Sequence, residues 1–222
     1  MGPACDYALQ RIRGRWRSGG ETLEVWWKRN GDFVQTGLAS AKIRAILTGG
    51  HRVLRCPRRA ANMPLSTELM NIIQHQFALD LEGIHGAEHW QRVCENGLRL
   101  AEETGADPAI LELFAYLHDS RRISDGWDRE HGHRAAAFVQ SLQGSHLLLC
   151  EEKLELLTYA CTHHSDGLVD ADVTVQTCWD ADRLDLGRIG LQPDPERLCT
   201  PAAKAPEIIE WAVRRSRDAG PG

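Results

Sequence analysis

The sequence has no apolar run that approaches the roughly 20 residues needed by a membrane-spanning helix, so we expect no membrane partner. Its N-terminus also lacks the apolar core of a secretion signal, and we therefore expect a cytoplasmic protein. The seven cysteines are odd in number and form no CxxC pair, which argues against a disulfide framework or a zinc ribbon and favours reduced thiols. Hydrophobic residues at 42% and charged residues at 26% are ordinary globular values, which argue against disorder or a fibrous repeat.

Acidic residues are scarce in the first part of the chain and abundant in the rest. Residues 1–62 carry 12 Lys/Arg against 4 Asp/Glu, whereas residues 63–222 carry 14 against 27. The second part is a poor nucleic-acid binder, because neutralising phosphates supplies most non-specific affinity. A length of 222 residues suits one domain with an appendage. We therefore divide the chain into a basic N-terminal segment, 1–62, and a single domain, 63–222.

The basic segment shows no consistent periodicity, and we assign it no fold. Trp16, Trp26 and Trp27 are interleaved with arginines, as in arms that bind nucleic acid or another anionic surface. A transit peptide is a second interpretation, which Asp6 and Glu21 disfavour because such segments are poor in acids. The remaining alternatives are a loosely packed appendage and translation that starts downstream, at residue 63.

From residue 63 onward the sequence predicts an all-α bundle of about six to seven helices, because no stretch keeps the period-two alternation of a strand. Asp107 and Pro108 are typical of a helix start, and Gly105 suits the left-handed position after a helix end. The expected helices span residues 66–81, 87–105, 108–119, a stretch from about 128, 146–163, 172–187 and a stretch after 206.

Reactive side chains fall on the apolar lines of these helices. Asp182 shares a line with Val175 and Trp179 at spacings of three and four, whereas Asp180 points elsewhere. Because an unpaired buried charge costs several kcal/mol, Asp182 must meet an arginine, a hydrogen-bond cage or a metal ion. The remaining inward or helix-end candidates are His89, His118, Asp119, His131, His163 and His164.

Imidazole and carboxylate groups together suit a divalent transition metal, since neutral histidine and ionised aspartate are both present at pH 7. Each of these residues taken alone is more often structural. Their convergence from several helices predicts a site for a divalent ion such as Mn, Fe, Co, Mg or Zn.

Five segments in this order resemble the HD-domain superfamily of metal-dependent phosphohydrolases, and its small stand-alone bacterial members in particular. They are HGAEHWQRV (85–93), LHDSRR (117–122), EHGHRAA (130–136), THHSDG (162–167) and DADRLDLG (180–187). The resemblance implies an HD-like helical fold over about residues 65–190. It places the first metal histidine on His89, the HD doublet on His118 and Asp119, and the final aspartate on Asp182. By the same resemblance, the further metal histidines correspond to His131, His163 and His164.

The implied activity is hydrolysis of a small phosphorylated substrate, with a nucleotide as one candidate. Metal-bound water would attack the ester, and Asp119, Arg122 and Arg183 are the expected catalytic residues. Three surplus histidines suggest one or two ions per chain, with Asp119 bridging. The GYP segment of the cyclic-dinucleotide-degrading branch is absent, which disfavours that substrate. Residues expected to orient the imidazoles or to bind phosphate are Asp125, Glu130, Asp185 and Arg121.

Two other functions remain open at this point, because a fold does not fix a reaction. One is a di-iron oxygenase, since myo-inositol oxygenase uses a similar ligand set. The other is a non-catalytic regulatory domain that binds a metal or a nucleotide.

Overall fold

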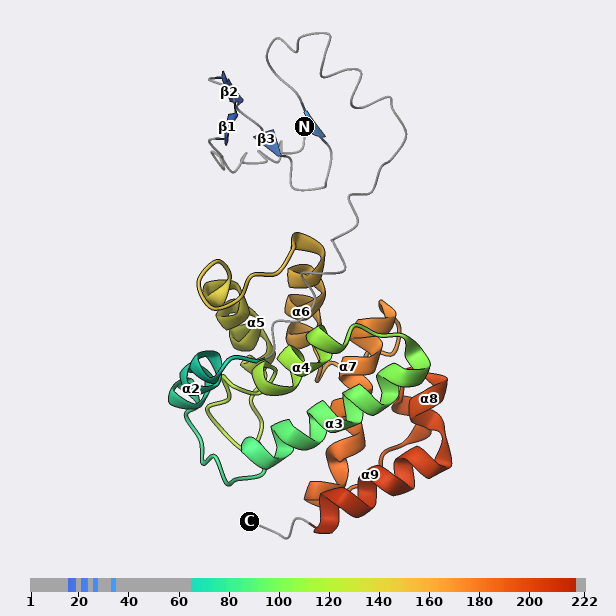
Figure 1. The fold of residues 1–222 in the computed structure, drawn as a ribbon. Coiled ribbons are helices and arrows are strands. Elements are labelled where there is room, and N and C mark those ends of the chain that lie inside the picture. Colours follow the sequence, from blue (N-terminus) through green and yellow to red (C-terminus); the bar gives the residue numbers. More distant parts are fainter. Residues whose placement is uncertain (1–15, 19–20, 24–25, 28–32, 35–64, 219–222) are drawn as a thin grey trace, which may run out of the picture. The chain divides into compact units, whose positions relative to one another are not determined.

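The computed structural model describes residues 65–218 and four short strands nearer the N-terminus (Figure 1). The chain divides into two units, Met1–Leu54 and Arg55–Gly222. In the first unit, β1 (Trp16–Ser18) pairs with β2 (Glu21–Leu23), and β3 (Trp26–Trp27) pairs with β4 (Phe33–Val34), both antiparallel. The predicted boundary at residue 62 lies outside the described residues.

The second unit is helical, which confirms the predicted all-α class for residues 65–218. None of the helices in this range has the length and apolar character needed to cross a bilayer. The elements are α2 (Thr67–Gln76), α3 (Ala87–Thr104), α4 (Pro108–Leu117), α5 (His131–Leu142), α6 (Glu151–His163), α7 (Val173–Arg183), the 3-10 helices η2 (Leu184–Ile189) and η3 (Pro195–Arg197), α8 (Pro201–Lys204) and α9 (Pro206–Asp218).

Several helix ends follow the capping rules that predicted them. Asp107 accepts a hydrogen bond from the Ala109 amide at the start of α4, so one otherwise free N–H of the first turn is satisfied. Asp172 caps α7 in the same way through Thr174. Gly105 ends α3 with a φ of 71°, a conformation that glycine adopts without steric cost.

Four predicted helix boundaries are wrong. The first helix stops at Gln76 rather than residue 81, because Phe77 turns into the extended region. The fourth begins at His131 rather than near 128, and the fifth begins at Glu151 rather than at 146. The sixth keeps α geometry only to Arg183 and continues as the 3-10 helix η2, whose tighter winding rotates the following side chains off the predicted line.

Two apolar clusters hold the described bundle together. In Figure 1, α3 packs against α4 and α7, while α5 packs along α6. The larger cluster lies between these helices and includes the fully buried side chains of Trp90, Phe114, Leu157 and Trp179. The smaller cluster joins α9 to η2 and α8, with Leu184 among its buried members. This packing brings the ends of five helices to one place.

Candidate metal centre

Four histidines and two aspartates reach a common point from five helices. The first turn of α3 supplies His89, and the residues that follow α4 supply His118 and Asp119. The remaining three are the first residue of α5, the residue that caps the end of α6, and one in the last turn of α7: His131, His164 and Asp182. All but Asp182 are buried, and the side chain of Asp182 is 18% exposed.

The first half of the cluster consists of His89 and His118 with two carboxylates. Their Nε2 atoms are 3.2 Å apart. Oδ2 of Asp119 lies 3.6 Å from each of these nitrogens. Oδ1 of Asp182 lies 3.5 Å from His89 and 3.8 Å from His118. Four donor atoms from three helix ends thus surround one small volume.

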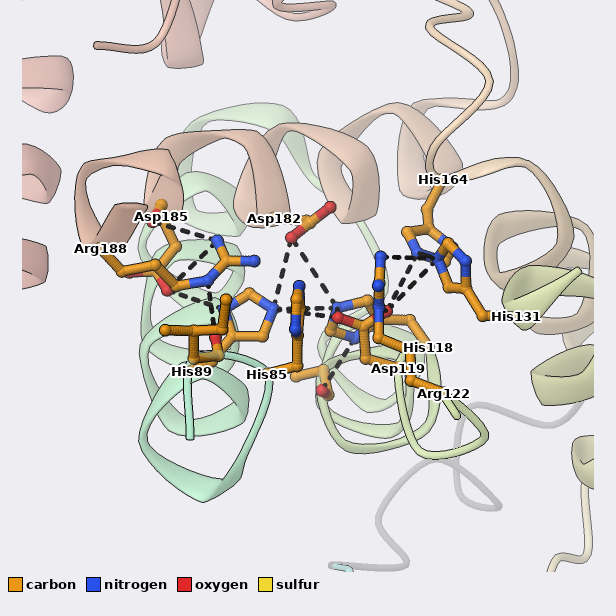
Figure 2. A network of polar contacts seen from close by, with 12 residues as sticks. His85, His89, His118, Asp119, Arg122, His131, His164, Asp182, Asp185 and Arg188 are labelled. Atoms are coloured by element: carbon orange, nitrogen blue, oxygen red, sulfur yellow. Dashed lines mark hydrogen bonds and ion pairs between the residues drawn. The ribbon is translucent and has the colours of Figure 1, made fainter. Parts of the chain in front are cut away.

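The second half contains His131 and His164 and shares Asp119 with the first. The Nε2 atoms of the two histidines are 2.8 Å apart. Oδ1 of Asp119 lies 3.4 Å from each of them. Figure 2 shows His89 on one side of Asp119 and the pair formed by His131 and His164 on the other. The two oxygens of a single carboxylate therefore face two different histidine pairs.

Hydrogen bonds at Nδ1 fix which nitrogen of each ring is free. Nδ1 of His118 donates to the carbonyls of Phe114 and Ala115, at 3.1 and 3.0 Å. His164 donates in the same way to Cys161 at 2.7 Å, and His131 donates to Asp128. A carbonyl can only accept, so these Nδ1 atoms carry the hydrogen and a neutral ring presents its lone pair at Nε2.

His89 is fixed by a carboxylate rather than a carbonyl. Its Nδ1 donates to Oδ2 of Asp185 at 2.7 Å, and Asp185 is fully buried. The other oxygen of Asp185 accepts from Arg92 at 2.7 Å and from Ser216 at 2.8 Å. Burial alone would raise the pKa of Asp185, but the hydrogen bonds from His89 and Arg92 lower it to about 2. Asp185 is therefore an ionised hydrogen-bond acceptor for Nδ1 of His89. Metal-bound histidines usually have such a partner on the nitrogen that does not bind the metal.

The pKa shifts in the cluster favour a neutral ring at His118 and charged carboxylates at Asp119 and Asp182. Burial lowers the pKa of His118 to about 3. Burial would raise the pKa of Asp119, but the neighbouring imidazoles of His118, His164 and His89 hold it well below its usual range. The pKa of Asp182 is also lowered, by His118 and His89 against the effect of burial. The pKa of His164 is raised despite burial, because Asp119 attracts positive charge to this position.

A divalent cation fits each half of this donor set. Two Nε2 lone pairs that face each other cannot hydrogen-bond, and beside ionised carboxylates they repel unless a positive charge lies among them. Ligand atoms about 2.1 Å from one ion and about 90–110° apart are about 3.0–3.4 Å from each other. The 3.2 Å between His89 and His118 lies in this range, and the 2.8 Å between His131 and His164 lies just below it.

The comparisons with known proteins identify the fold. No family model and no curated protein matches the sequence. The chain is similar to the crystal structure of a predicted HD superfamily hydrolase from an uncultured Thermotogales bacterium, at a TM-score of 0.54. The chain has the HD fold. The two chains are 24% identical, and the match covers 68% of this chain and 86% of the other.

Within this HD fold, two of the residues expected at the site lie elsewhere. His163 is next to His164 but points outward, where its Nδ1 pairs with Asp166 at 2.7 Å. Successive helical residues differ in direction by about 100°, so only one of the two histidines faces the cluster. Arg183 donates to the carbonyls of Arg197 and Leu168, each at 2.7 Å. It therefore ties loops together and does not reach the cluster.

Other expected residues contribute in different ways. Arg122 donates from Nε to Oδ1 of Asp119 at 2.9 Å, and its Nη2 lies 3.4 Å from Nε2 of His131. Arg121 instead donates to the backbone and side chain of Gln76. Glu130 is exposed and lies 3.9 Å from His133, which is also exposed. Asp125 does bind an imidazole, but not one of those predicted at the site.

That imidazole belongs to His85, a buried residue just before α3. Its Nδ1 donates to Oδ1 of Asp125 at 2.8 Å, and its ring centroid lies 6.3 Å from that of His89 (Figure 2). The sequence patterns also gave no indication of Arg188. It donates from Nε to the carbonyl of Ile84, the residue before His85, at 2.8 Å. The spacing of His85 and His89, one helical turn apart, was the available signal. It fell outside the expected helix, which begins at residue 87.

Proposed function

We propose that this chain is an HD-type metal-dependent phosphohydrolase with two divalent ions per chain. The observation that carries the proposal is the position of Asp119, whose two carboxylate oxygens face two separate pairs of histidines. A carboxylate shared in this way is the ligand that two-metal hydrolases need.

Each ion has its own ligands in this proposal. His89, His118, Asp119 and Asp182 would hold the first, and Asp119, His131 and His164 would hold the second. The donor atoms of His89, His118 and Asp119 lie close enough together to share an ion, as do those of Asp119, His131 and His164, and Asp182 forms a third such group with His118 and His164. Bound divalent ions would supply an activated water and positive charge for the phosphoryl oxygens. Mn, Fe, Co, Mg and Zn all remain candidates, because imidazole and carboxylate ligands do not select one of them.

The residues around the ligands prepare the site before any substrate arrives. Arg122 holds Asp119 in its bridging orientation through a 2.9 Å hydrogen bond and adds positive charge beside an anionic substrate. Asp182 is the most exposed of the six ligand residues, so its side of the cluster is the direction from which a substrate approaches. The substrate class that fits is a small phosphate ester, including a nucleotide.

Hydrolysis is favoured over an HD-type oxygenase by the comparison, because the similar structure is described as a predicted hydrolase. A non-catalytic role is disfavoured by the solvent-reachable carboxylate of Asp182 beside otherwise buried ligands. Both alternatives would use the same ligand residues as the proposed hydrolase, so an activity assay is needed to distinguish the three functions.

The test is a substrate panel on purified full-length protein that has been stripped of metal and reloaded with Mn²⁺. Release of phosphate or alcohol is measured from nucleotides, simple phosphomonoesters and a chromogenic phosphodiester. We expect turnover of at least one class that disappears in Asp119→Ala and in the metal-free protein. Oxygen uptake by the Fe²⁺-loaded protein, with no ester hydrolysed under any metal, would contradict the proposal.

A further inference from the structure

His85 is a buried histidine beside the cluster, and it belongs to neither of the two proposed sets of metal ligands. Its side chain is 8% exposed, and Asp125 is the partner of its Nδ1. Among residues 65–218, no donor or acceptor engages its Nε2, and this nitrogen is not among the fully buried unpaired atoms. The small exposed part of the side chain therefore includes Nε2.

The backbone on both sides of His85 is held in place. The carbonyl of Ile84 accepts the 2.8 Å hydrogen bond from Arg188. On the other side, a Cβ at Gly86 would lie 2.1 Å from the carbonyl oxygen of Leu81, so the chain passes here only because residue 86 is glycine. The ring is thus presented from a fixed position, which is the arrangement that orientation of a reactant requires.

Asp125 is in turn connected to the metal ligands. It lies on the loop between Asp119 and His131, and Arg122 donates to the carbonyls on both sides of it, Ser124 at 3.2 Å and Gly126 at 3.4 Å. The same guanidinium donates to Asp119. One arginine therefore sets both the bridging carboxylate and the loop that orients His85.

The chemistry of the free nitrogen follows from these contacts. Because Nδ1 donates to Asp125, Nε2 of the neutral ring is an acceptor. Burial lowers the pKa of His85, against the effects of Asp119 and Asp125, so the neutral form is present at pH 7. An acceptor cannot bind a fully ionised phosphoryl oxygen, but it can accept a hydrogen bond from water.

We infer that His85 is a catalytic residue of the proposed phosphohydrolase, with Nε2 accepting a hydrogen bond from the attacking water and Asp125 acting as its positioning residue. This inference rests on the proposed function. It adds to the proposed metal ligands a residue that orients the attacking water. It also requires that the exposed edge of the His85 ring faces the bound substrate.

Three variants test the role in Mn²⁺-loaded full-length protein with bis(4-nitrophenyl) phosphate. His85→Ala is expected to keep its metal and its Tm and to lose kcat about 100-fold, with KM changed less than about threefold. His85→Gln, whose amide oxygen can accept near the same place, should retain about tenfold more kcat than His85→Ala. Asp125→Ala removes a half-exposed side chain and should lower kcat about tenfold. His163→Ala is the matched control, because His163 has the same pairing with an aspartate but points away from the cluster.

Chemical labelling gives a second readout that needs no turnover. In the metal-loaded protein, diethylpyrocarbonate should modify Nε2 of His85, and orthovanadate should suppress that modification but not the one at His163, both followed by mass spectrometry. Loss of metal from His85→Ala would make His85 a ligand and overturn the inference. An unchanged kcat, or labelling of His85 that vanadate does not affect, would also overturn it. If the wild type hydrolysed no ester, the proposed function would fail, and the vanadate protection alone would decide whether His85 faces a bound anion.

Discussion

Replacing Asp185 with asparagine should weaken metal binding without touching a proposed ligand. Both oxygens of Asp185 accept hydrogen bonds, Oδ2 from His89 and Oδ1 from Arg92 and Ser216. In Asp185→Asn the amide NH₂ faces a donor whichever way the group turns. Either His89 loses the acceptor that holds its ring, or Arg92 and Ser216 lose theirs.

The expected loss in metal affinity is about 10–100-fold, which is the usual effect of removing a partner of a metal-bound histidine. This corresponds to about 1.4–2.7 kcal/mol of binding free energy. The variant should also lose about 1–3 kcal/mol of unfolding free energy, because a buried hydrogen-bonding group loses its partner and the partly buried Arg92 keeps only its 3.4 Å pair with Glu88. Mn²⁺ titration followed by electron paramagnetic resonance gives the affinity, and urea denaturation of the metal-free protein gives the stability.

Asp180→Asn is the matched control for this experiment. Asp180 is equally buried, but its oxygens accept from the amides of Cys199 and Thr200, at 2.6 and 2.8 Å, and from the Thr200 hydroxyl at 2.7 Å. It therefore fixes the start of α8 and not the cluster. We expect Asp180→Asn to lose stability and keep its Mn²⁺ affinity. If Asp185→Asn behaved in the same way, with affinity within about twofold of the wild type, the orientation of His89 by Asp185 would be refuted.

Three further predictions concern the ligands, the packing behind them and the domain boundary. His118→Ala and Asp119→Ala should each lose bound metal and activity while keeping the helical circular dichroism of the wild type. Full metal occupancy in both variants would contradict the assignment of these residues as ligands. Gly132→Ala should cost about 1–3 kcal/mol and weaken the second metal site, because its Cβ would lie 2.5 Å from the carbonyl oxygen of Thr162 on α6; a wild-type Tm would contradict this. A chain that starts at Met63 should fold and remain active, and insolubility of that chain alone would show that residues 1–62 belong to the fold.

Much of the candidate site could be predicted from sequence because its proposed ligands lie at helix ends or on apolar lines. His131 and His164 are buried in line with Ala135 and Cys161, as the spacing of three and four indicated. The same rule selected Asp182, but it did not foresee that Asp180 is buried too. Asp180 is buried because of a tertiary contact: it accepts hydrogen bonds from the backbone that leads into α8, which helical spacing alone does not reveal.

The parts that could not be predicted depend on loops. Arg183 follows a proposed ligand in sequence, yet loop carbonyls draw it away from the cluster. His85 lies before its helix, and the path of the backbone beside it depends on the close approach of Gly86 to the carbonyl oxygen of Leu81. The α-helical spacing predicted for residues 172–187 does not hold after Arg183, because the helix tightens to 3-10 geometry, which leaves Ile189 exposed and buries Leu184 and Asp185.

The number of ions bound per chain tests the two-metal proposal most directly. Metal analysis by mass spectrometry on anaerobically prepared protein should give two ions per chain for the wild type. It should give one for the double variant His131→Ala, His164→Ala, because His89, His118, Asp119 and Asp182 are left intact. One ion per chain in the wild type, unchanged in the double variant, would contradict the second site and leave a mononuclear centre.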